Sequence, residues 1–257
     1  MSMKHSRERF QGLLPGLRTS LREKGVLHVI RSVIKEVTFR LDGHIGYRYH
    51  KLFRSGDSFR LDGKSYHYFY HIYGKTWKNE RAVEVPVIWA AVRDRLGKTT
   101  LEIGNVLPNY FSFPHDVVDK YEIADGVVNR DVVDFQTTKR YDLIVSISTM
   151  EHVGWEEEPR EPEKVLRGFQ NLMSLLAPRG RILVTMPLGL NPALDGYIRD
   201  GALKFAKLLF MKRMQTGNQW EEAGWEDVRD VPYDHQRRRA NALVIGVIEN
   251  VVKPTVG

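Results

Sequence analysis

The sequence predicts an α/β fold in which helices cover both faces of a mainly parallel sheet, and two observations carry this expectation. From residue 99 onward, short apolar runs alternate with polar stretches that suit helices, which is typical of consecutive strand–helix–strand units. The runs 141–147 and 180–186 are apolar almost throughout, as in strands covered on both faces. The expected strands are 99–103, 115–119, 126–129, 141–147, 180–186 and 242–249, with a helix at about 162–177.

The first 80 residues are expected to form an extension to this domain, which would itself occupy residues 81–257. In residues 25–41 apolar positions follow helical spacing with basic residues between them, which predicts an amphipathic helix. In "SFRLDGKSYHYF" (58–69) an Asp-Gly pair separates flanks rich in aromatic residues. This predicts a β-hairpin, because both central positions of a tight turn favour residues that tolerate positive φ. A further helix is expected to begin at about Arg81.

Composition narrows the classes of protein. A hydrophobic content of 42% is enough for a proper core. The absence of cysteine excludes disulfides, thiolate metal sites and a cysteine nucleophile. The charged N-terminus has no hydrophobic stretch behind it, and no apolar run reaches the roughly 18 residues of a membrane span. The expected location is the cytoplasm.

Positive charge is concentrated in the extension. Residues 1–80 hold 16 basic and 7 acidic residues, a net charge of +9, whereas the whole chain carries +7. Such asymmetry indicates either a solvated face or contact with an anionic partner, which would be a membrane surface at which the protein is peripheral, a phosphate-bearing acceptor or nucleic acid.

Acidic side chains follow successive predicted strands. Because ligands of such sheets bind at the carboxyl ends of the strands, these side chains are expected to meet at one edge. Asp119 lies 17 residues beyond Glu102, close to the spacing at which a second-strand carboxylate bonds ribose hydroxyls. Asp131, one strand later, can accept a hydrogen bond from an exocyclic amine. The three acids together predict an adenosine-shaped site.

Three stretches between residues 99 and 190 carry a family resemblance. "LEIG", "YDLIVSISTMEHVG" and "LLAPRGRILVTMP" resemble, in order and spacing, the first-strand motif, fourth strand and fifth strand of the class I S-adenosylmethionine-dependent methyltransferases. "NERAVEVP", "LEIGNVLPNY" and "VSISTMEHVGW" are similar to strings of a bacterial and archaeal subgroup encoded near cell-surface glycan genes. The resemblance implies a Rossmann-like, seven-stranded sheet with an antiparallel last strand, and S-adenosylmethionine as cofactor.

The first motif departs from the family pattern, because Val106 and Pro108 stand where further glycines are usual. Those glycines let a pyrophosphate approach the backbone, and S-adenosylmethionine has no phosphate. One glycine, Gly104, can therefore suffice for the methionine moiety. The same departure argues against a nicotinamide dinucleotide.

The resemblance assigns cofactor roles position by position. Asp119 would bind ribose, and Asp131 with the backbone of Val132 would meet adenine. The serines would line the sulfonium, although strand-end capping is an equal alternative for them. The complete predicted cofactor set is Glu102, Gly104 and Asn105 at the methionine moiety, Asp119, Asp131, Val132, Ser146 and Ser148.

Catalytic and acceptor residues are expected around the same edge. His152 is the candidate general base, because histidine is the side chain that ordinarily takes up a proton near working pH, and Glu151 would orient it or bind a substrate hydroxyl; a structural role for the pair is the alternative. Arg81 would pair with the methionine carboxylate or an acceptor phosphate, or else form an ion pair at its helix start. The predicted acceptor residues are Trp77, Arg81, Asn191 and Asp195.

Two further patterns are interpreted structurally. His67 and His71 have no third ligand at a sensible spacing, so aromatic packing is expected and no metal site is predicted. The basic run "RRRANA" (237–242) is interpreted as surface.

The favoured function is O-methylation of a sugar, glycan or other small molecule. A nucleic-acid methyltransferase is the first alternative, since the extension is basic, but no RNA-binding module or proline-rich amide-reading motif is recognisable. A non-catalytic S-adenosylmethionine-binding protein is the second.

Overall fold

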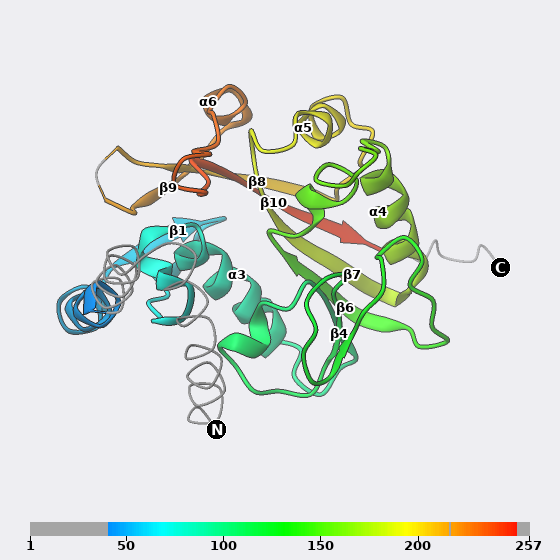
Figure 1. The fold of residues 1–257 in the computed structure, drawn as a ribbon, viewed down its shortest axis with the longest axis horizontal. Coiled ribbons are helices and arrows are strands. Elements are labelled where there is room, and N and C mark those ends of the chain that lie inside the picture. The colour runs from blue at the N-terminus through cyan, green and yellow to red at the C-terminus, as the bar shows by residue number, and fades with distance from the viewer. Residues whose placement is uncertain (1–40, 216, 251–257) are drawn as a thin grey trace, which may run out of the picture. The chain divides into compact units, whose positions relative to one another are not determined.

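The computed structural model describes residues 41–215 and 217–250. The chain divides into two compact units, residues 1–49 and 50–257. Residues 41–53 are helical, and every strand and helix described after residue 53 belongs to the second unit (Figure 1). The predicted helix at 25–41 lies outside the described residues except for Leu41.

The second unit contains an eight-stranded sheet and a two-stranded hairpin. The strand order of the large sheet is β5-β4-β3-β6-β7-β10-β8-β9. The strands are β1 (Ser58–Leu61), β2 (Lys64–His67), β3 (Thr100–Ile103), β4 (Asp116–Val118), β5 (Val127–Val128), β6 (Tyr141–Ile147), β7 (Leu176–Pro187), β8 (Lys207–Arg213), β9 (Trp220–Ala223) and β10 (Ala242–Glu249). The helices are α3 (Arg81–Arg93), α4 (Lys164–Ser174), α5 (Pro192–Arg199) and α6 (Trp225–Val228), with short 3₁₀ turns η1 (Tyr73–Lys78), η2 (Leu107–Asn109) and η3 (Met150–His152).

The predicted fold class is confirmed. Strands β5, β4, β3, β6 and β7 run parallel, and β10 runs antiparallel to β7. The sheet has eight strands rather than seven, because β9 pairs with β8 at the far edge. Neither β8 nor β9 is among the predicted strands. The backbone of β8 pairs with β10, a strand from a later segment of the chain, and β9 has only four residues. Local pattern alone therefore does not reveal either strand.

Helices cover both faces of the sheet, as the continuous apolar strands indicated. Leu143 and Val145 of β6 lie in one core cluster with Ile88 of α3. Ile144, between them, lies in the other cluster with Phe169 of α4. Successive strand residues point to opposite faces, so both faces of β6 are buried. Figure 1 shows α3 and α4 on opposite sides of the sheet.

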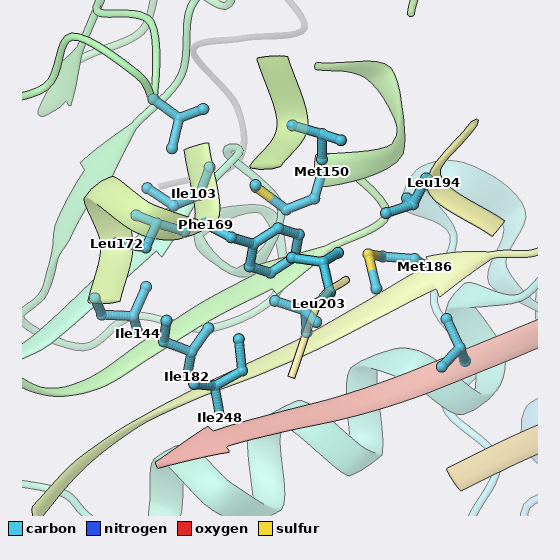
Figure 2. Close-up of a cluster of buried hydrophobic side chains, with 14 of the residues drawn as sticks. Ile103, Ile144, Met150, Phe169, Leu172, Ile182, Met186, Leu194, Leu203 and Ile248 are labelled. Atoms are coloured by element: carbon cyan, nitrogen blue, oxygen red, sulfur yellow. The ribbon is translucent and has the colours of Figure 1, made fainter. Parts of the chain in front are cut away.

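The cluster beneath α4 anchors a turn at the edge of the sheet. Figure 2 shows the Phe169 ring among Met150, Leu172, Met186 and Leu203. Met150 and Phe169 are both fully buried. Since Met150 begins η3, this packing fixes the turn that carries the two residues after it.

The predicted hairpin forms at β1 and β2. Asp62 and Gly63 have φ values of 55° and 72°, the positive φ that the turn requires. The hairpin lies against β9, and the backbone N–H of Trp220 donates to the Tyr68 hydroxyl at 2.8 Å. The hairpin thus belongs to the same compact unit as the sheet.

Candidate functional site

A cavity of about 670 Å³ lies at the carboxyl ends of the parallel strands. The chain leaves β3 for β4 on one side and later returns to β6 on the other, so strand order switches at β3. Ligands of open α/β sheets bind at such a switch point. The predicted residues that line this cavity are Arg81, Gly104, Asn105, Asp119, Asp131, Val132, Ser148 and His152.

The cavity has two ends, which lie on opposite flanks of β3 and β6 in the strand order. The β5 end is formed by Asp119, Lys120, Arg130 and Asp131, which follow β4 and β5. The β10 end is formed by Arg81, His152, Glu156 and Arg238, which come from α3, from η3 and the segment after it, and from the loop before β10.

The other predicted residues lie outside the cavity lining. Glu102, Ser146 and Glu151 are fully buried, and the Ser146 hydroxyl has no hydrogen-bond partner among the described residues. Trp77, also buried, lines a second cavity of about 250 Å³. Asn191 and Asp195 lie at the start of α5.

Glu102 shapes the loop that follows β3. Its Oε1 accepts hydrogen bonds from the backbone N–H groups of Val106 and Leu107, at 2.9 and 2.8 Å. Its Oε2 lies 2.9 Å from Nε2 of His115. Both carboxylate oxygens are thus engaged within the chain. The observed contribution of Glu102 is to hold the loop containing Asn105 and Val106 against the cavity.

Gly104 is required by its backbone and by a close neighbour. Its φ is +88°, which favours glycine, and a Cβ there would collide with the Thr149 hydroxyl. Both residues line the cavity. The glycine therefore lets the β3 and β6 ends approach each other.

Asp119 presents a partly free carboxylate to the β5 end. Its Oδ1 accepts from the backbone N–H groups of Tyr121 and Glu122, at 2.8 and 2.7 Å, which fixes the side chain in a local turn. Its Oδ2 accepts no hydrogen bond within residues 41–215 and 217–250. A ligand hydroxyl can therefore reach this oxygen without breaking an existing bond.

Asp131 belongs to a four-residue charge cluster at the same end. Its Oδ2 lies 2.9 Å from Lys120 Nζ and 2.6 Å from Lys164 Nζ, and Glu157 completes the cluster by contacting both lysines. Burial raises the pKa of Asp131, but hydrogen bonds from Lys164 and Lys120 outweigh it, so the pKa lies below its ordinary value. Sequence reasoning missed Lys120, Lys164 and Glu157, because charged side chains in loops and at helix starts are usually solvated.

Glu84 links α3 to the ends of β6 and β7. Its Oε1 accepts from the hydroxyls of Ser148, at 2.5 Å, and Thr185, at 2.8 Å, and its Oε2 lies 2.7 Å from Nη1 of Arg81. The Glu84 side chain is fully buried, whereas Arg81 retains 22% exposure and lines the cavity. Ser148 has a φ of +42°, a conformation that side chains rarely adopt. The carboxylate thereby holds a strained strand end in place.

Glu151 and His152 differ in burial although they are adjacent. The Glu151 carboxyl is fully buried, and neither of its oxygens has a hydrogen-bond partner in the described part of the chain. Burial, with the nearby charge of Glu84, raises its pKa well above the ordinary value. His152 lines the cavity with its side chain 41% exposed, its Nε2 3.6 Å from Glu151 and its Nδ1 2.9 Å from Glu156.

The predicted acceptor residues near α5 act on the backbone around the site. Asn191 caps α5 by accepting from two backbone N–H groups, and its Nδ2 donates to the Glu151 carbonyl at 2.9 Å. Asp195 accepts from the Gly189 N–H at 2.9 Å, and burial raises its pKa to about 6. The contact of Asn191 with the site is therefore indirect, through the backbone carbonyl of Glu151.

The basic run before β10 is only partly a surface feature. Arg237 and Arg238 are both exposed as expected, but Arg238 also lines the cavity. A strand pairing that joins distant segments brings it there, so no local signal could have revealed it.

Two classes of site are not found among residues 41–215 and 217–250. No group of three or more potential ligand side chains is placed to hold a metal ion there. In the same residues, no helix combines the length and the apolar character that crossing a bilayer demands.

The known proteins to which this chain is similar are solved structures. No family model matches the chain, and no curated protein matches it. The N-methyltransferase NodS from Bradyrhizobium japonicum WM9, solved with S-adenosyl-L-homocysteine, is 13% identical, with 66% of this chain and 87% of that one covered and a TM-score of 0.43. The sugar N-methyltransferase KedS8 from Streptoalloteichus is 13% identical, with 65% and 87% covered and a TM-score of 0.35. Magnesium protoporphyrin IX methyltransferase from Synechocystis PCC 6803, with bound S-adenosylmethionine, is 11% identical, with 65% and 78% covered and a TM-score of 0.36.

These three similar structures are methyltransferases, but their sequence identity to this chain and their TM-scores are low. A function for this chain therefore has to be argued from the residues of its own cavity.

Proposed function

We propose that the chain is an S-adenosylmethionine-dependent methyltransferase that methylates a hydroxyl of a sugar or another small molecule. One observation carries the proposal. Residues from the ends of β3, β4 and β6, and from the segment after β5, line a single cavity at the switch in strand order. The motif resemblance of these same strand ends supports the choice of cofactor.

The cavity fits the cofactor in size and in its polar groups. A volume of about 670 Å³ falls within the roughly 300–1,000 Å³ usual for ligand sites. The available Oδ2 of Asp119 can accept from ribose hydroxyls. Asn105 also lines the cavity, and its buried Oδ1 has no partner among the described residues, so it can accept from the methionine ammonium group.

The remaining cofactor assignments follow position. We assign adenine to the neighbourhood of Asp131 and Val132, and the sulfonium to that of Ser148. Glu102 and Gly104 would act by shaping the loop beside the methionine moiety, and Ser146 by supporting the β6 end. Because Asp131 already pairs with two lysines, its contribution to adenine binding would be weaker than that of Asp119 to ribose binding.

His152 is the side chain best placed to take a proton from the acceptor. When bound, the cofactor supplies a methyl group on a good leaving centre, so the chain mainly has to align the acceptor and remove its proton. His152 reaches the cavity at the β10 end. The Glu151 carboxyl, 3.6 Å from Nε2 of His152, would orient the imidazole, while Asn191 would position Glu151 through its backbone carbonyl.

The acceptor would occupy the β10 end. Arg81 borders it directly. Trp77 and Asp195 would affect the acceptor only indirectly, since neither lines the cavity.

Calorimetry tests the cofactor assignment directly. We expect S-adenosylmethionine and S-adenosylhomocysteine to bind the full chain and NADH not to bind. Binding of NADH without either methionine derivative would refute the proposal. Mass spectrometry of sugar acceptors incubated with labelled S-adenosylmethionine then identifies the methylated product.

A further inference from the structure

The loop before β10 belongs to the edge of the sheet where the cavity lies. Because β10 runs antiparallel to β7, its first residues lie beside the last residues of β7, and Leu243 pairs with Pro187. The parallel strands end at that same edge. Residues just before Ala242 are therefore delivered to the ligand-binding side of the sheet, on the opposite flank from β4 and β5.

Three consecutive arginines in this loop have different environments. Arg237 and Arg239 each lie 3.3 Å from the carboxylate of Asp234, one on either side of the middle residue. Arg238 instead lines the cavity. It forms no hydrogen bond or ion pair with any of the described residues.

The backbone of Arg238 is strained. Its φ is +49°, in the left-handed region that glycine or asparagine adopts far more readily. Residues in such conformations cost of order 1–3 kcal/mol and cluster at ligand-binding sites. An arginine in this position suggests that its side chain contributes something that a glycine could not.

The other cations of the cavity are differently occupied. Arg81 is paired with the buried Glu84, and Lys120 is paired with Asp131 and Glu157. Arg130 and Arg238 are both exposed and form no ion pair with the described residues, but Arg130 lies at the β5 end, where the adenosine would lie. At the β10 end, Glu156 pairs with His152, so Arg238 is the cation of that end that no carboxylate of the described residues pairs.

We propose that Arg238 binds an anionic group of the acceptor, a carboxylate or a phosphate. A guanidinium suits this task because its planar N–H groups match both anions with two parallel hydrogen bonds. The inference rests on the proposed function, since it places the acceptor at the β10 end. It narrows the acceptor class from sugars in general to acidic or phosphorylated ones.

The test compares three probes on the full chain at fixed ionic strength. Glucuronate, glucose 6-phosphate and glucose are titrated by calorimetry or ligand-observed NMR, with and without saturating S-adenosylhomocysteine. We expect at least one of the two anions to bind about tenfold or more tightly than glucose, and which one does so tells carboxylate from phosphate.

Three variants show which arginine produces the preference for an anion. Arg238→Gln should remove it, whereas Arg130→Gln, which makes the same charge change at the β5 end, should retain it. Arg238→Gly should also remove the preference while leaving the melting temperature equal to or above that of the wild type, because glycine relieves the left-handed backbone. That result separates a binding role from a structural one.

Three results would overturn the inference. The wild type could bind both anions no better than glucose, both glutamine variants could lose the preference equally, or Arg238→Gln could weaken S-adenosylhomocysteine while retaining the preference. A preference that depends on Arg238 in a chain that does not bind S-adenosylhomocysteine would instead refute the proposed function and leave the anion site standing.

Discussion

The β5 end and the β10 end of the cavity differ in how many of their polar groups are already paired within the chain. At the β5 end, Asp131 and Glu157 are matched by two lysines, and Asp119 is locked by two backbone hydrogen bonds. Beside the β10 end, neither oxygen of the buried Glu151 carboxyl has a hydrogen-bond partner among the described residues. The exposed guanidinium of Arg238, which lines that end, forms no ion pair with the same residues. An unmade bond of a buried polar group such as the Glu151 carboxyl is costly. The comparison suggests that the β5 end is organised before any ligand binds, and that the β10 end is completed by one.

The largest effect is expected from His152→Ala at the β10 end. Loss of a general base lowers turnover by about 10²–10⁴. Cofactor affinity should change little, because the β5 end is left intact. Turnover by mass spectrometry and S-adenosylhomocysteine affinity by calorimetry give the two readouts. Turnover within a few-fold of the wild type between pH 6 and 9 would assign His152 a structural role.

Glu84→Ala should cause the largest loss of stability. It leaves the partly buried Arg81 without its counter-charge and removes the acceptor of the Ser148 and Thr185 hydroxyls. Breaking a buried pair in this way costs about 3–5 kcal/mol of unfolding free energy. Urea unfolding measures the loss, and Glu84→Gln, which keeps an acceptor oxygen, should lose less. A loss below about 1 kcal/mol in the alanine variant would mean that Arg81 finds another partner.

Asp119→Ala tests whether the β5 end holds the ribose. Losing a charge-assisted hydrogen bond should weaken S-adenosylhomocysteine by about 1.5–3 kcal/mol, roughly 10- to 150-fold. Asp125→Ala removes an exposed acid from the same loop and serves as the matched control. Equal calorimetric affinities for the two variants would remove Asp119 from the site.

Asp195→Asn should change how stability depends on pH. Burial raises the pKa of Asp195 to about 6 in the folded chain, against about 3.9 when unfolded. Its neutral form therefore stabilises the fold fully below pH 4, and that contribution is lost as pH rises through 6. The asparagine variant keeps an acceptor for the Gly189 N–H and does not ionise, so it should gain about 2–3 kcal/mol over the wild type between pH 4 and 7. A constant difference across unfolding curves at these two pH values would contradict the assignment.

The smallest effect on the cavity is expected from deleting residues 1–24. Every predicted cofactor residue lies beyond residue 100, so S-adenosylhomocysteine affinity should remain nearly unchanged. Association with anionic vesicles, if the basic segment makes it, should weaken, and the loss should shrink at high salt. Co-sedimentation and a cofactor titration measure both quantities. Lost cofactor binding with unchanged vesicle association would show that the segment supports the cavity instead.

The residues that line the β5 end could be predicted from the sequence more completely than those that line the β10 end. Asp119 and Asp131 could be placed at the β5 end because each follows a short apolar strand, and parallel strands end at a common edge. Arg238 is exposed, as its interpretation as a surface residue expected, but its place at the cavity was not predicted. Its position depends on β10 pairing with β7, a contact between segments far apart in the chain.

Local pattern by itself determined the order of elements from β3 to β7, the hairpin turn at Asp62-Gly63 and the strand ends that border the cavity, because periodicity and turn chemistry are properties of neighbouring residues. Only the tertiary structure decided which polar groups are already paired. Glu102 holds a loop, Glu84 joins three elements, and Glu151 is buried without a partner among the described residues. The sequence around Glu84 does not say which hydroxyls will bond its carboxylate, because Ser148 and Thr185 come from strand ends 60 or more positions away.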